Sequence, residues 1–263
     1  MSFVLHRFSA CGNTFFICDI NKNPSILVDQ IQIEQRSRLA RLWCSGFVGF
    51  RTDGLIFLSH ILQGQKYVWD FYNRDGSKAV MCGNAARVVA QYLGVEHAHL
   101  ETAIGLVQIG VGPNQMPYAM WELPSLSVLK NKHMEFEQKA YTFSVIDTGV
   151  PHALIEMAPH LPLARALRSC RLYFPEGMNV TFLKERAEGE VEAVTFERGV
   201  EDFTLSCGTG AVAAACWAWD RHPNVLCHHV MMPGGVLTVE FTPPHQVTLK
   251  GNVDFHFKLE VNE

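Results

Sequence analysis

The chain has 263 residues, enough for one large domain or two ordinary ones, and a composition of 48% hydrophobic and 18% charged residues that is typical of globular proteins. A formal net charge of −4 without a basic stripe argues against nucleic acid or a membrane surface as a partner. No apolar run approaches the roughly 20 residues of a membrane span, and the first residues do not resemble a secretion signal, so we expect a cytoplasmic protein.

The first half of the chain alternates short apolar segments with helical patterns. In chain order, the predicted elements are a glycine-broken strand over residues 8–19, a helix over 28–43, strands over 54–59 and 67–72, a helix from Cys82 to 93, and a β-rich tail over 107–111. Gly94 follows the second helix and is typical of a helix C-terminus.

The second half shows the same order of elements. They are a glycine-broken strand over 143–156, a helix over 161–170, strands over 178–184 and 193–197, a helix from Cys207 to about 219, and β-rich segments over 234–241, 246–249 and 255–261. We therefore expect an α+β fold of two pseudo-symmetric domains, each a sheet wrapped around a central helix. The Gly- and Pro-rich stretch at 112–117 puts the domains at 1–115 and 116–249, with 250–263 as a candidate to complete the first.

Two Cys-Gly pairs in matching surroundings are the strongest functional signal. Cys82 and Cys207 each follow a short apolar run and open a run of small and apolar residues. A thiol at a helix N-terminus faces unpaired N–H groups and the positive end of the helix dipole, which favours the thiolate. Singly, each would more often be a buried core thiol. As a pair facing one another across a cleft, they would supply an acid and a base to opposite faces of one carbon, with no cofactor.

The N–H groups and glycines that follow each cysteine suit a bound carboxylate. In the second half, Arg198 offers a fork for a carboxylate and Glu197 a partner for an ammonium group, although such a pair on a strand is usually a solvated face. His152 is either an acid–base helper or a hydrogen-bonded structural histidine.

Other polar residues have an ordinary explanation beside the functional one. Asn73 stands at the entry of an Asp-Gly turn, and Asn13 and Asn179 are turn candidates by default. The eight cysteines include no Cys-x-x-Cys pair, and Cys227-His228-His229 alternates between strand faces, so no metal site is expected.

Taken together, the motifs resemble those of the diaminopimelate epimerase family, in family order over residues 12–237. The matching pieces are Gly12-Asn13-x-Phe15, Asp53-Gly54-Leu55-Ile56, Phe71-x-Asn73-x-Asp75-Gly76-Ser77, Met81-Cys82-Gly83-Asn84 with Arg87, Thr148-Gly149-x-Pro151-His152, Phe174-Pro175-x-Gly177-x-Asn179-Val180, Glu197-Arg198-Gly199-Val200, Cys207-Gly208-Thr209-Gly210-Ala211 and Pro233-Gly234-Gly235-x-Leu237.

The resemblance implies a pyridoxal-independent epimerase that interconverts L,L- and meso-diaminopimelate for lysine or cell-wall precursor synthesis. It implies an active site between the two domains and, in many members, a homodimer. Cys82 and Cys207 match the acid–base pair, and His152 stays a supporting candidate. The remaining matches are the carboxylate-holding Gly83, Asn84, Gly208 and Thr209, and the substrate-gripping Asn13, Asn73, Asn179, Glu197 and Arg198.

Three positions depart from the family pattern: Ala85, Arg51 and Val150 stand where glycine, glycine and asparagine are usual. None is a thiol, so they bear on the substrate more than on the reaction. Open alternatives are a racemase of another amino acid such as glutamate, using the same thiol pair, and a non-enzymatic thiol redox sensor or ligand-binding relic. An isomerase of the same fold without a thiol pair is disfavoured because both cysteines are retained.

Overall fold

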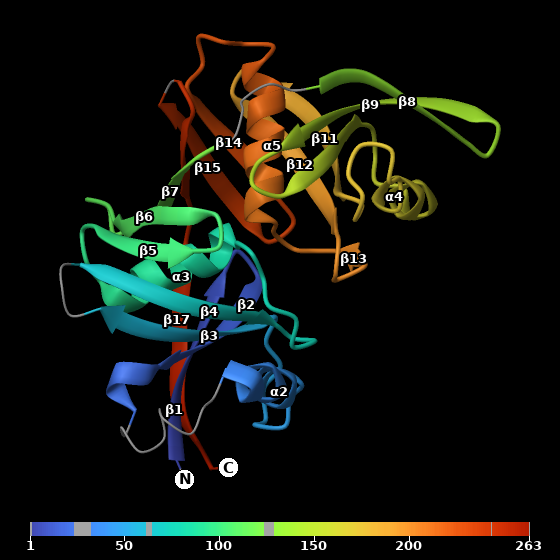
Figure 1. The fold of residues 1–263 in the computed structure, drawn as a ribbon. Helices are drawn as coiled ribbons and strands as arrows, with labels where there is room; N and C mark the ends of the chain where they lie inside the picture. The colour runs from blue at the N-terminus through green and yellow to red at the C-terminus, as the bar shows by residue number, and fades with distance from the viewer. Residues whose placement is uncertain (1, 24–32, 62–64, 124–128, 243, 263) are drawn as a thin grey trace. The chain divides into compact units, whose positions relative to one another are not determined.

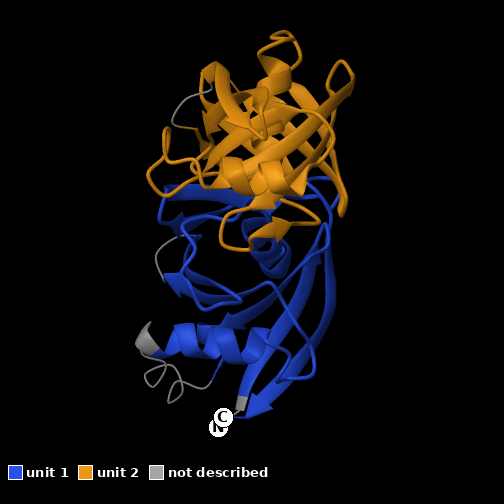
Figure 2. Cartoon of the chain, turned by 90° about the vertical axis from the view of Figure 1, so that its right-hand side faces the viewer, with its two compact units in different colours: residues 1–119, 251–263 blue, residues 120–250 orange. Residues whose placement is uncertain are grey.

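The computed structural model describes residues 2–23, 33–61, 65–123, 129–242 and 244–262. The chain divides into two compact units, unit 1 with residues 1–119 and 251–263 and unit 2 with residues 120–250 (Figure 2). The sequence-based boundary lay at 115/116, whereas the structure divides the chain within a strand, β7 (Pro117–Glu122).

In the part of unit 1 that the structure describes, most elements are strands, and the α-helices are α2 and α3 (Figure 1). Its elements are β1 (Ser2–Ala10), β2 (Asn13–Asp19), the 3-10 helix η1 (Ile20–Lys22), α2 (Ile33–Cys44), β3 (Gly54–Ile61), β4 (Lys66–Asn73), α3 (Gly83–Leu93), β5 (Ala98–Thr102), β6 (Gly105–Val111) and β17 (Val253–Asn262). The first five residues of the helix predicted over 28–43 lie outside the described residues, and the rest of it is α2.

The sheet of unit 1 curls around α3. Its hydrogen-bonded order is β17-β1-β2-β3-β4-β5-β6, and α3 packs against β6 at one end of that order and against β1, β2 and β17 at the other. Residues 83–90 of α3 are all buried, as expected of a helix that is surrounded on every side. A further cluster of buried apolar side chains in unit 1 includes Trp43 of α2 with Leu55 and Phe57 of β3.

Unit 2 repeats this design around α5 (Figure 1). Its elements are β8 (Leu129–Phe136), β9 (Lys139–Asp147), β10 (Pro151–Glu156), α4 (Leu161–Arg168), β11 (Asn179–Ala187), β12 (Glu190–Glu197), β13 (Asp202–Phe203), α5 (Gly208–Trp219), β14 (Cys227–Met232), β15 (Gly235–Thr242) and β16 (Gln246–Lys250). The helix α5 is buried from residue 208 to 218 and packs against β10, β11, β12, β14, β15 and β16.

The two units share one order of strand pairing. Neighbouring strands alternate antiparallel, parallel, antiparallel, parallel, antiparallel from β1 to β6 and again from β9 to β15. A parallel pair needs a long crossover, and here each one carries a helix, α2 and α3 in unit 1 and α4 and α5 in unit 2. The prediction of two pseudo-symmetric α+β halves, each with a sheet around a helix, is confirmed.

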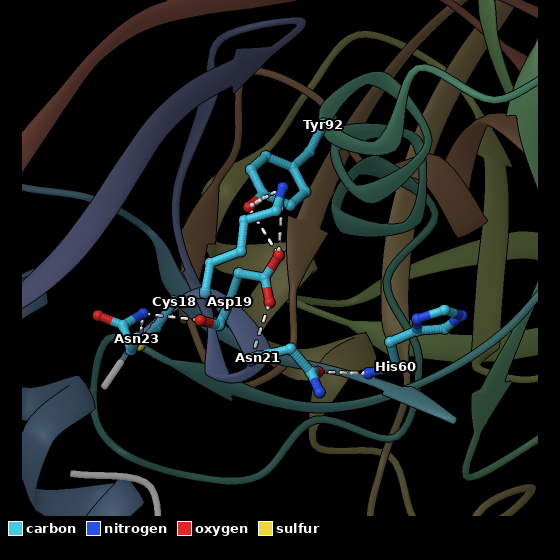
Figure 3. Close-up of polar contacts among 7 residues, drawn as sticks. Cys18, Asp19, Asn21, Asn23, His60 and Tyr92 are labelled. Carbon is cyan, nitrogen blue, oxygen red and sulfur yellow. Dashed lines mark hydrogen bonds and ion pairs between the residues drawn. The ribbon is translucent and has the colours of Figure 1, made fainter. Parts of the chain in front are cut away.

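A cluster of polar side chains connects the C-terminal part of α3 to the end of β2 by hydrogen bonds (Figure 3). The Tyr92 hydroxyl donates to Asp19 Oδ2 at 2.8 Å, and Lys22 Nζ lies 3.1 Å from that hydroxyl and 3.5 Å from the carboxylate. Asp19 Oδ1 accepts from the backbone N–H of Asn21, whose side chain accepts from the backbone N–H of His60. Burial and the neighbouring Asp19 carboxylate raise the pKa of Tyr92, so it stays a neutral donor. These contacts anchor the C-terminal part of α3 to β2, and the N-terminus of the same helix follows Cys82.

Candidate functional site

Cys82 is the N-cap residue of α3. Its backbone is extended (φ −148°, ψ 113°), and its sulfur accepts a hydrogen bond from the N–H of Ala85 at 3.4 Å. A cap of this kind satisfies one of the N–H groups that a helix N-terminus leaves unpaired. An accepted N–H bond together with the helix dipole stabilises sulfur in its anionic form. The helix start predicted at Cys82 is confirmed.

Cys207 occupies the same position on α5. Its backbone is also extended (φ −127°, ψ 111°), and its sulfur accepts from the N–H of Gly210 at 3.4 Å. The Thr209 hydroxyl lies 3.5 Å from the sulfur, and the backbone N–H of Cys207 points to the sulfur of Met232 at 3.4 Å. Cys207 is only 5% exposed. The duplicated sequence motif is therefore a duplicated local structure, a sulfur-capped helix start in each unit.

Gly210 is required where it stands. A Cβ atom at that position would lie 2.3 Å from the Thr195 hydroxyl and 3.2 Å from the Cβ of Cys207. The matching position in unit 1 carries Ala85, which is fully buried. The departure from the family pattern at Ala85 is therefore accommodated in unit 1, whereas the same substitution in unit 2 would press on the strand behind the helix.

A chain of side-chain amides lies beside Cys82. Arg87 Nη2 donates to Asn84 Oδ1, and Asn84 Nδ2 donates to Asn13 Oδ1, each at 2.6 Å. A guanidinium has only donors, so Asn84 must present its oxygen to Arg87 and its N–H₂ group to Asn13. Asn13 must in turn present its oxygen to Asn84. The Arg87 guanidinium thus sets the orientation of the Asn84 and Asn13 side-chain amides. The Asn13 oxygen is used within this series, so the group that Asn13 can offer to a ligand is its N–H₂ group.

Asn73 has turn contacts in the described structure. It is the last residue of β4, its backbone N–H donates to Ser77 O at 2.9 Å, and its side-chain N–H₂ group donates to Ser77 Oγ at 3.0 Å. Asp75 accepts from the N–H and the hydroxyl of the same serine. The turn interpretation thus accounts for these contacts, while a contact of Asn73 with substrate stays a prediction.

His152 is wholly buried on β10, at the centre of a polar string behind Cys207. Its Nε2 lies 3.0 Å from Thr209 Oγ1, and its Nδ1 lies 3.0 Å from Thr181 Oγ1, which in turn contacts Thr195 Oγ1 at 3.0 Å. Burial, with a smaller contribution from the positive charge of Arg198, lowers the pKa of His152 to about 3. The histidine is therefore neutral at physiological pH.

Sequence analysis missed Thr181 and Thr195 in this string. Both are buried threonines within strands that were predicted, and neither stands in a motif that suggests chemistry. The sequence does give one indication of them: each is a polar residue in a predicted strand, and the residues before and after it in the sequence are apolar. A buried hydroxyl needs a hydrogen-bond partner, so two of them in adjacent strands point to a polar network.

Asn179 connects His152 to the Glu197–Arg198 segment. Its N–H₂ group lies 3.3 Å from His152 Nε2, and its oxygen accepts from the backbone N–H of Arg198 at 2.8 Å. The Arg198 guanidinium donates to Gly177 O at 3.4 Å, and Glu197 accepts from the Thr204 hydroxyl at 2.5 Å. The hydrogen bonds thus link three predicted residues of unit 2, Asn179, His152 and Thr209, to Cys207.

The structure brings the predicted residues together in two groups. Unit 1 holds Cys82, Gly83, Asn84 and Asn13 around the start of α3, and unit 2 holds Cys207, Gly208, Thr209, His152, Asn179, Glu197 and Arg198 at and behind the start of α5. Within the described ranges, no three His, Cys, Asp or Glu side chains are arranged to hold a metal ion. On β14, Cys227 and His229 are exposed and His228 is buried, so this triplet alternates as predicted. No helix among the described residues has the length and apolar character to cross a membrane.

Comparison of the sequence with known proteins identifies one family. The family model described as diaminopimelate epimerase matches residues 16–112 and 144–255. The diaminopimelate epimerase of Campylobacter jejuni subsp. doylei is 34% identical over 207 residues, which are 78% of this chain and 77% of that protein.

Two solved structures share the fold at low sequence identity. A putative phenazine biosynthesis PhzC/PhzF protein from Clostridium difficile is 10% identical with a TM-score of 0.70, covering 99% of this chain and 100% of its own. A hydroxyproline epimerase from Agrobacterium vitis, with bound trans-4-OH-L-proline, is 16% identical with a TM-score of 0.68, covering 99% and 92%. At these identities the likeness concerns the fold alone.

Proposed function

Because this chain belongs to the diaminopimelate epimerase family, we propose that it interconverts L,L- and meso-diaminopimelate. The chain is an isomerase of that family, and the proposal concerns its substrate and the residues that act. The observation that carries it is the pair of sulfur-capped helix starts, Cys82 on α3 and Cys207 on α5, at equivalent positions of two repeated units.

The reaction we propose is a two-base proton transfer at the α-carbon. One cysteine thiolate removes the α-proton, and the C–H bonding electrons become the carbanion pair, which the adjacent carboxylate delocalises. The other cysteine, as the neutral thiol, gives its proton to the opposite face of that carbon and becomes the thiolate. The roles of Cys82 and Cys207 reverse for the opposite direction, so protons and charge balance over one turnover.

Backbone N–H groups at the two helix starts would bind the substrate α-carboxylate. Gly83 and Asn84 follow Cys82, and Gly208 and Thr209 follow Cys207, so both helices direct N–H groups and positive dipole ends beside a thiol. Donors fixed in place before the reaction stabilise the charge that develops as the proton leaves. We assign no metal or pyridoxal cofactor to this chemistry.

The more distant groups of the substrate would be bound by polar side chains. We propose Asn13, Asn73, Asn179, Glu197 and Arg198 for this role. Carboxamides and a guanidinium suit a carboxylate, and the Glu197 carboxylate suits an ammonium group. His152 would support Thr209 from behind as a neutral hydrogen-bond partner, because its pKa is about 3.

The test is incubation of the purified protein with L,L-diaminopimelate in D₂O. We expect deuterium at the α-carbon and an approach to a mixture of L,L and meso isomers. L-Glutamate under the same conditions is the matched comparison. Exchange of glutamate with none of diaminopimelate would replace the proposed substrate, and exchange of neither would favour a non-catalytic thiol protein.

The biological setting is part of the same proposal. The product would serve lysine or cell-wall precursor synthesis in the cytoplasm, and the enzyme would act as a homodimer. Light scattering on the eluting protein measures the mass directly, and a mass near 29.5 kDa would contradict the dimer.

A further inference from the structure

Arg87 is a fully buried residue one turn into α3, and its guanidinium is hydrogen-bonded on several sides. Nη1 donates to the backbone oxygen of Asn252 at 3.4 Å, directly before β17. The guanidinium also hydrogen-bonds the side chain of Cys11, in the turn between β1 and β2. Nη2 donates to Asn84 Oδ1 at 2.6 Å. The contacts to the turn and to the segment before β17 hold the guanidinium in place as a fixed donor to Asn84.

The side-chain amide of Asn84 leaves one arrangement for that of Asn13. Because Asn84 Oδ1 accepts from a guanidinium, a group with donors only, Asn84 directs its N–H₂ group to Asn13 Oδ1 at 2.6 Å. Exchanging oxygen and nitrogen in Asn13 alone would set two N–H₂ groups against each other. Exchanging them in both amides would turn an N–H₂ group toward Arg87. The N–H₂ group of Asn13 is thus directed away from Asn84, at a half-buried position at the start of β2.

The direction of these hydrogen bonds decides which substrate group suits Asn13. An N–H₂ group donates to a carboxylate oxygen, whereas an ammonium group has only donors and needs an acceptor. We propose that Arg87 is a positioning residue which, through Asn84, fixes Asn13 as a hydrogen-bond donor to a substrate carboxylate. This inference rests on the proposed function because it takes Asn13 to contact the substrate, but it does not depend on turnover.

The experiment measures binding by protection of Cys82, so it needs no turnover. Iodoacetamide alkylation of Cys82 is followed by peptide mass spectrometry at increasing concentrations of L,L-diaminopimelate, and each rate is scaled to the rate of the same variant without ligand. L-Glutamate is run in parallel, and the compound that protects is used throughout. The half-protecting concentration is then compared among variants. Because of the scaling, a change in the reactivity of the thiol itself does not enter the comparison.

N13D tests the direction of the Asn13 amide. It keeps the shape of the side chain and still accepts from Asn84, but it presents an oxygen where the N–H₂ group was. We expect the half-protecting concentration to rise about tenfold or more, because a charge-assisted hydrogen bond is replaced by repulsion between two carboxylates. An unchanged or lower concentration overturns the proposal, since that result would mean that Asn13 presents its oxygen, to an ammonium group.

N21D is the matched control. Asn21 is an exposed asparagine of the same unit, two residues beyond the end of β2, whereas Asn13 is its first residue. The Asn21 side chain accepts from the backbone N–H of His60, and a carboxylate would do the same. N21D adds the same charge to unit 1 and should leave the half-protecting concentration within about twofold of the wild type, because exposed charges that far apart are screened.

R87M tests whether Arg87 acts through Asn13. Without the guanidinium both amides are able to reverse, so the half-protecting concentration should rise about three- to tenfold, and R87K should restore most of the binding. In R87M/N13D the concentration should equal that of N13D alone, because the introduced carboxylate cannot donate in either direction. Effects that multiply in the double variant would assign Arg87 a merely structural role and overturn the proposal, as would a folded R87M with wild-type binding.

N84D is read in place of R87M should R87M fail to fold. Its carboxylate still accepts from Arg87 but has no N–H₂ group, so Asn13 must turn its own N–H₂ group inward and present its oxygen to the ligand. A rise like that of N13D supports the proposal, and wild-type binding overturns it. Absence of protection of the wild type by either compound also overturns it. A wild type that is protected without epimerising the ligand contradicts the proposed function alone.

Discussion

The imidazole Nε2 of His152 lies 3.0 Å from the hydroxyl of Thr209, two residues after the Cys207 thiol. The same hydroxyl lies 3.5 Å from the Cys207 sulfur, so a single threonine stands between the histidine and the thiol. Since the ring is neutral and buried, it acts on this hydroxyl as a hydrogen-bond partner and contributes no positive charge.

We predict that His152 makes the protein less stable in mild acid. Its pKa is 6.5 when exposed and about 3 in the folded chain, so between these values the unfolded state binds the extra proton. Stability therefore rises with pH across this window and falls as the pH drops below about 6.5. The loss from this one group is roughly 2 kcal/mol between pH 7 and pH 5. Urea unfolding at the two pH values measures it.

His152→Gln is the comparison for that measurement. The variant should be less stable than the wild type at pH 7, because it loses part of the buried hydrogen-bond string, but its stability should change less between pH 7 and pH 5. Equal changes in the two proteins would show that His152 is not the group responsible.

Gly210→Ala should disrupt the start of α5 around Cys207. The added methyl would lie 2.3 Å from Thr195 Oγ1, so either the strand or the helix start must move. We expect a loss of roughly 1–3 kcal/mol of stability and a large fall in turnover. Thermal unfolding and the epimerase assay measure the two effects.

Ala85→Gly is the matched change in the other unit, because the Ala85 N–H donates to the Cys82 sulfur as the Gly210 N–H donates to the Cys207 sulfur. It removes a buried methyl group and should cost roughly 1–2 kcal/mol through helix propensity and lost burial, with turnover largely kept. An Ala85→Gly variant as impaired as Gly210→Ala would argue that the crowding at Thr195 is not the cause.

Activity should require both capping thiols. Cys82→Ala and Cys207→Ala each remove the acid or the base from one face of the substrate, so each should lower epimerisation by several orders of magnitude. Cys227→Ala removes an exposed thiol on β14 and should behave as the wild type. Near-normal isomerisation by either capping variant would contradict a two-base mechanism.

Activity should also survive removal of metals and of reactive carbonyl cofactors. The helix starts provide the donors that the carbanion needs, and the proposed chemistry routes no step through a metal or pyridoxal group. Dialysis against EDTA and treatment with hydroxylamine should each leave turnover unchanged. Activity that is lost and then regained on adding a divalent cation or pyridoxal phosphate would disprove the assignment.

Sequence periodicity predicted the repeated core of the fold because that core is apolar and punctuated by glycine. The helix starts at Cys82 and Cys207 follow from a small-residue run after a strand, and both are observed. The strand β8 was missed, since its residues are exposed or half-exposed along its whole length and leave no apolar pattern.

The candidate site was predicted less completely, and for a different reason. Arg87 lies in a helix, and a charged helical residue is normally exposed, so its complete burial depends on strands far away in sequence. The hydroxyl string through Thr181 and Thr195 likewise exists only once three strands are adjacent. Local pattern predicts the element that carries a residue but not the partners that tertiary packing brings to it.

The pairing of β1 with β17 affects the order in which the two units can fold during synthesis. Residues 2–10 are synthesised long before residues 253–262, which complete their register about 250 positions later. In the part of unit 2 that the structure describes, the strands from β8 to β15 pair with one another over much shorter separations in sequence. Although it is synthesised second, unit 2 is therefore able to finish folding while the nascent first unit still lacks its closing strand.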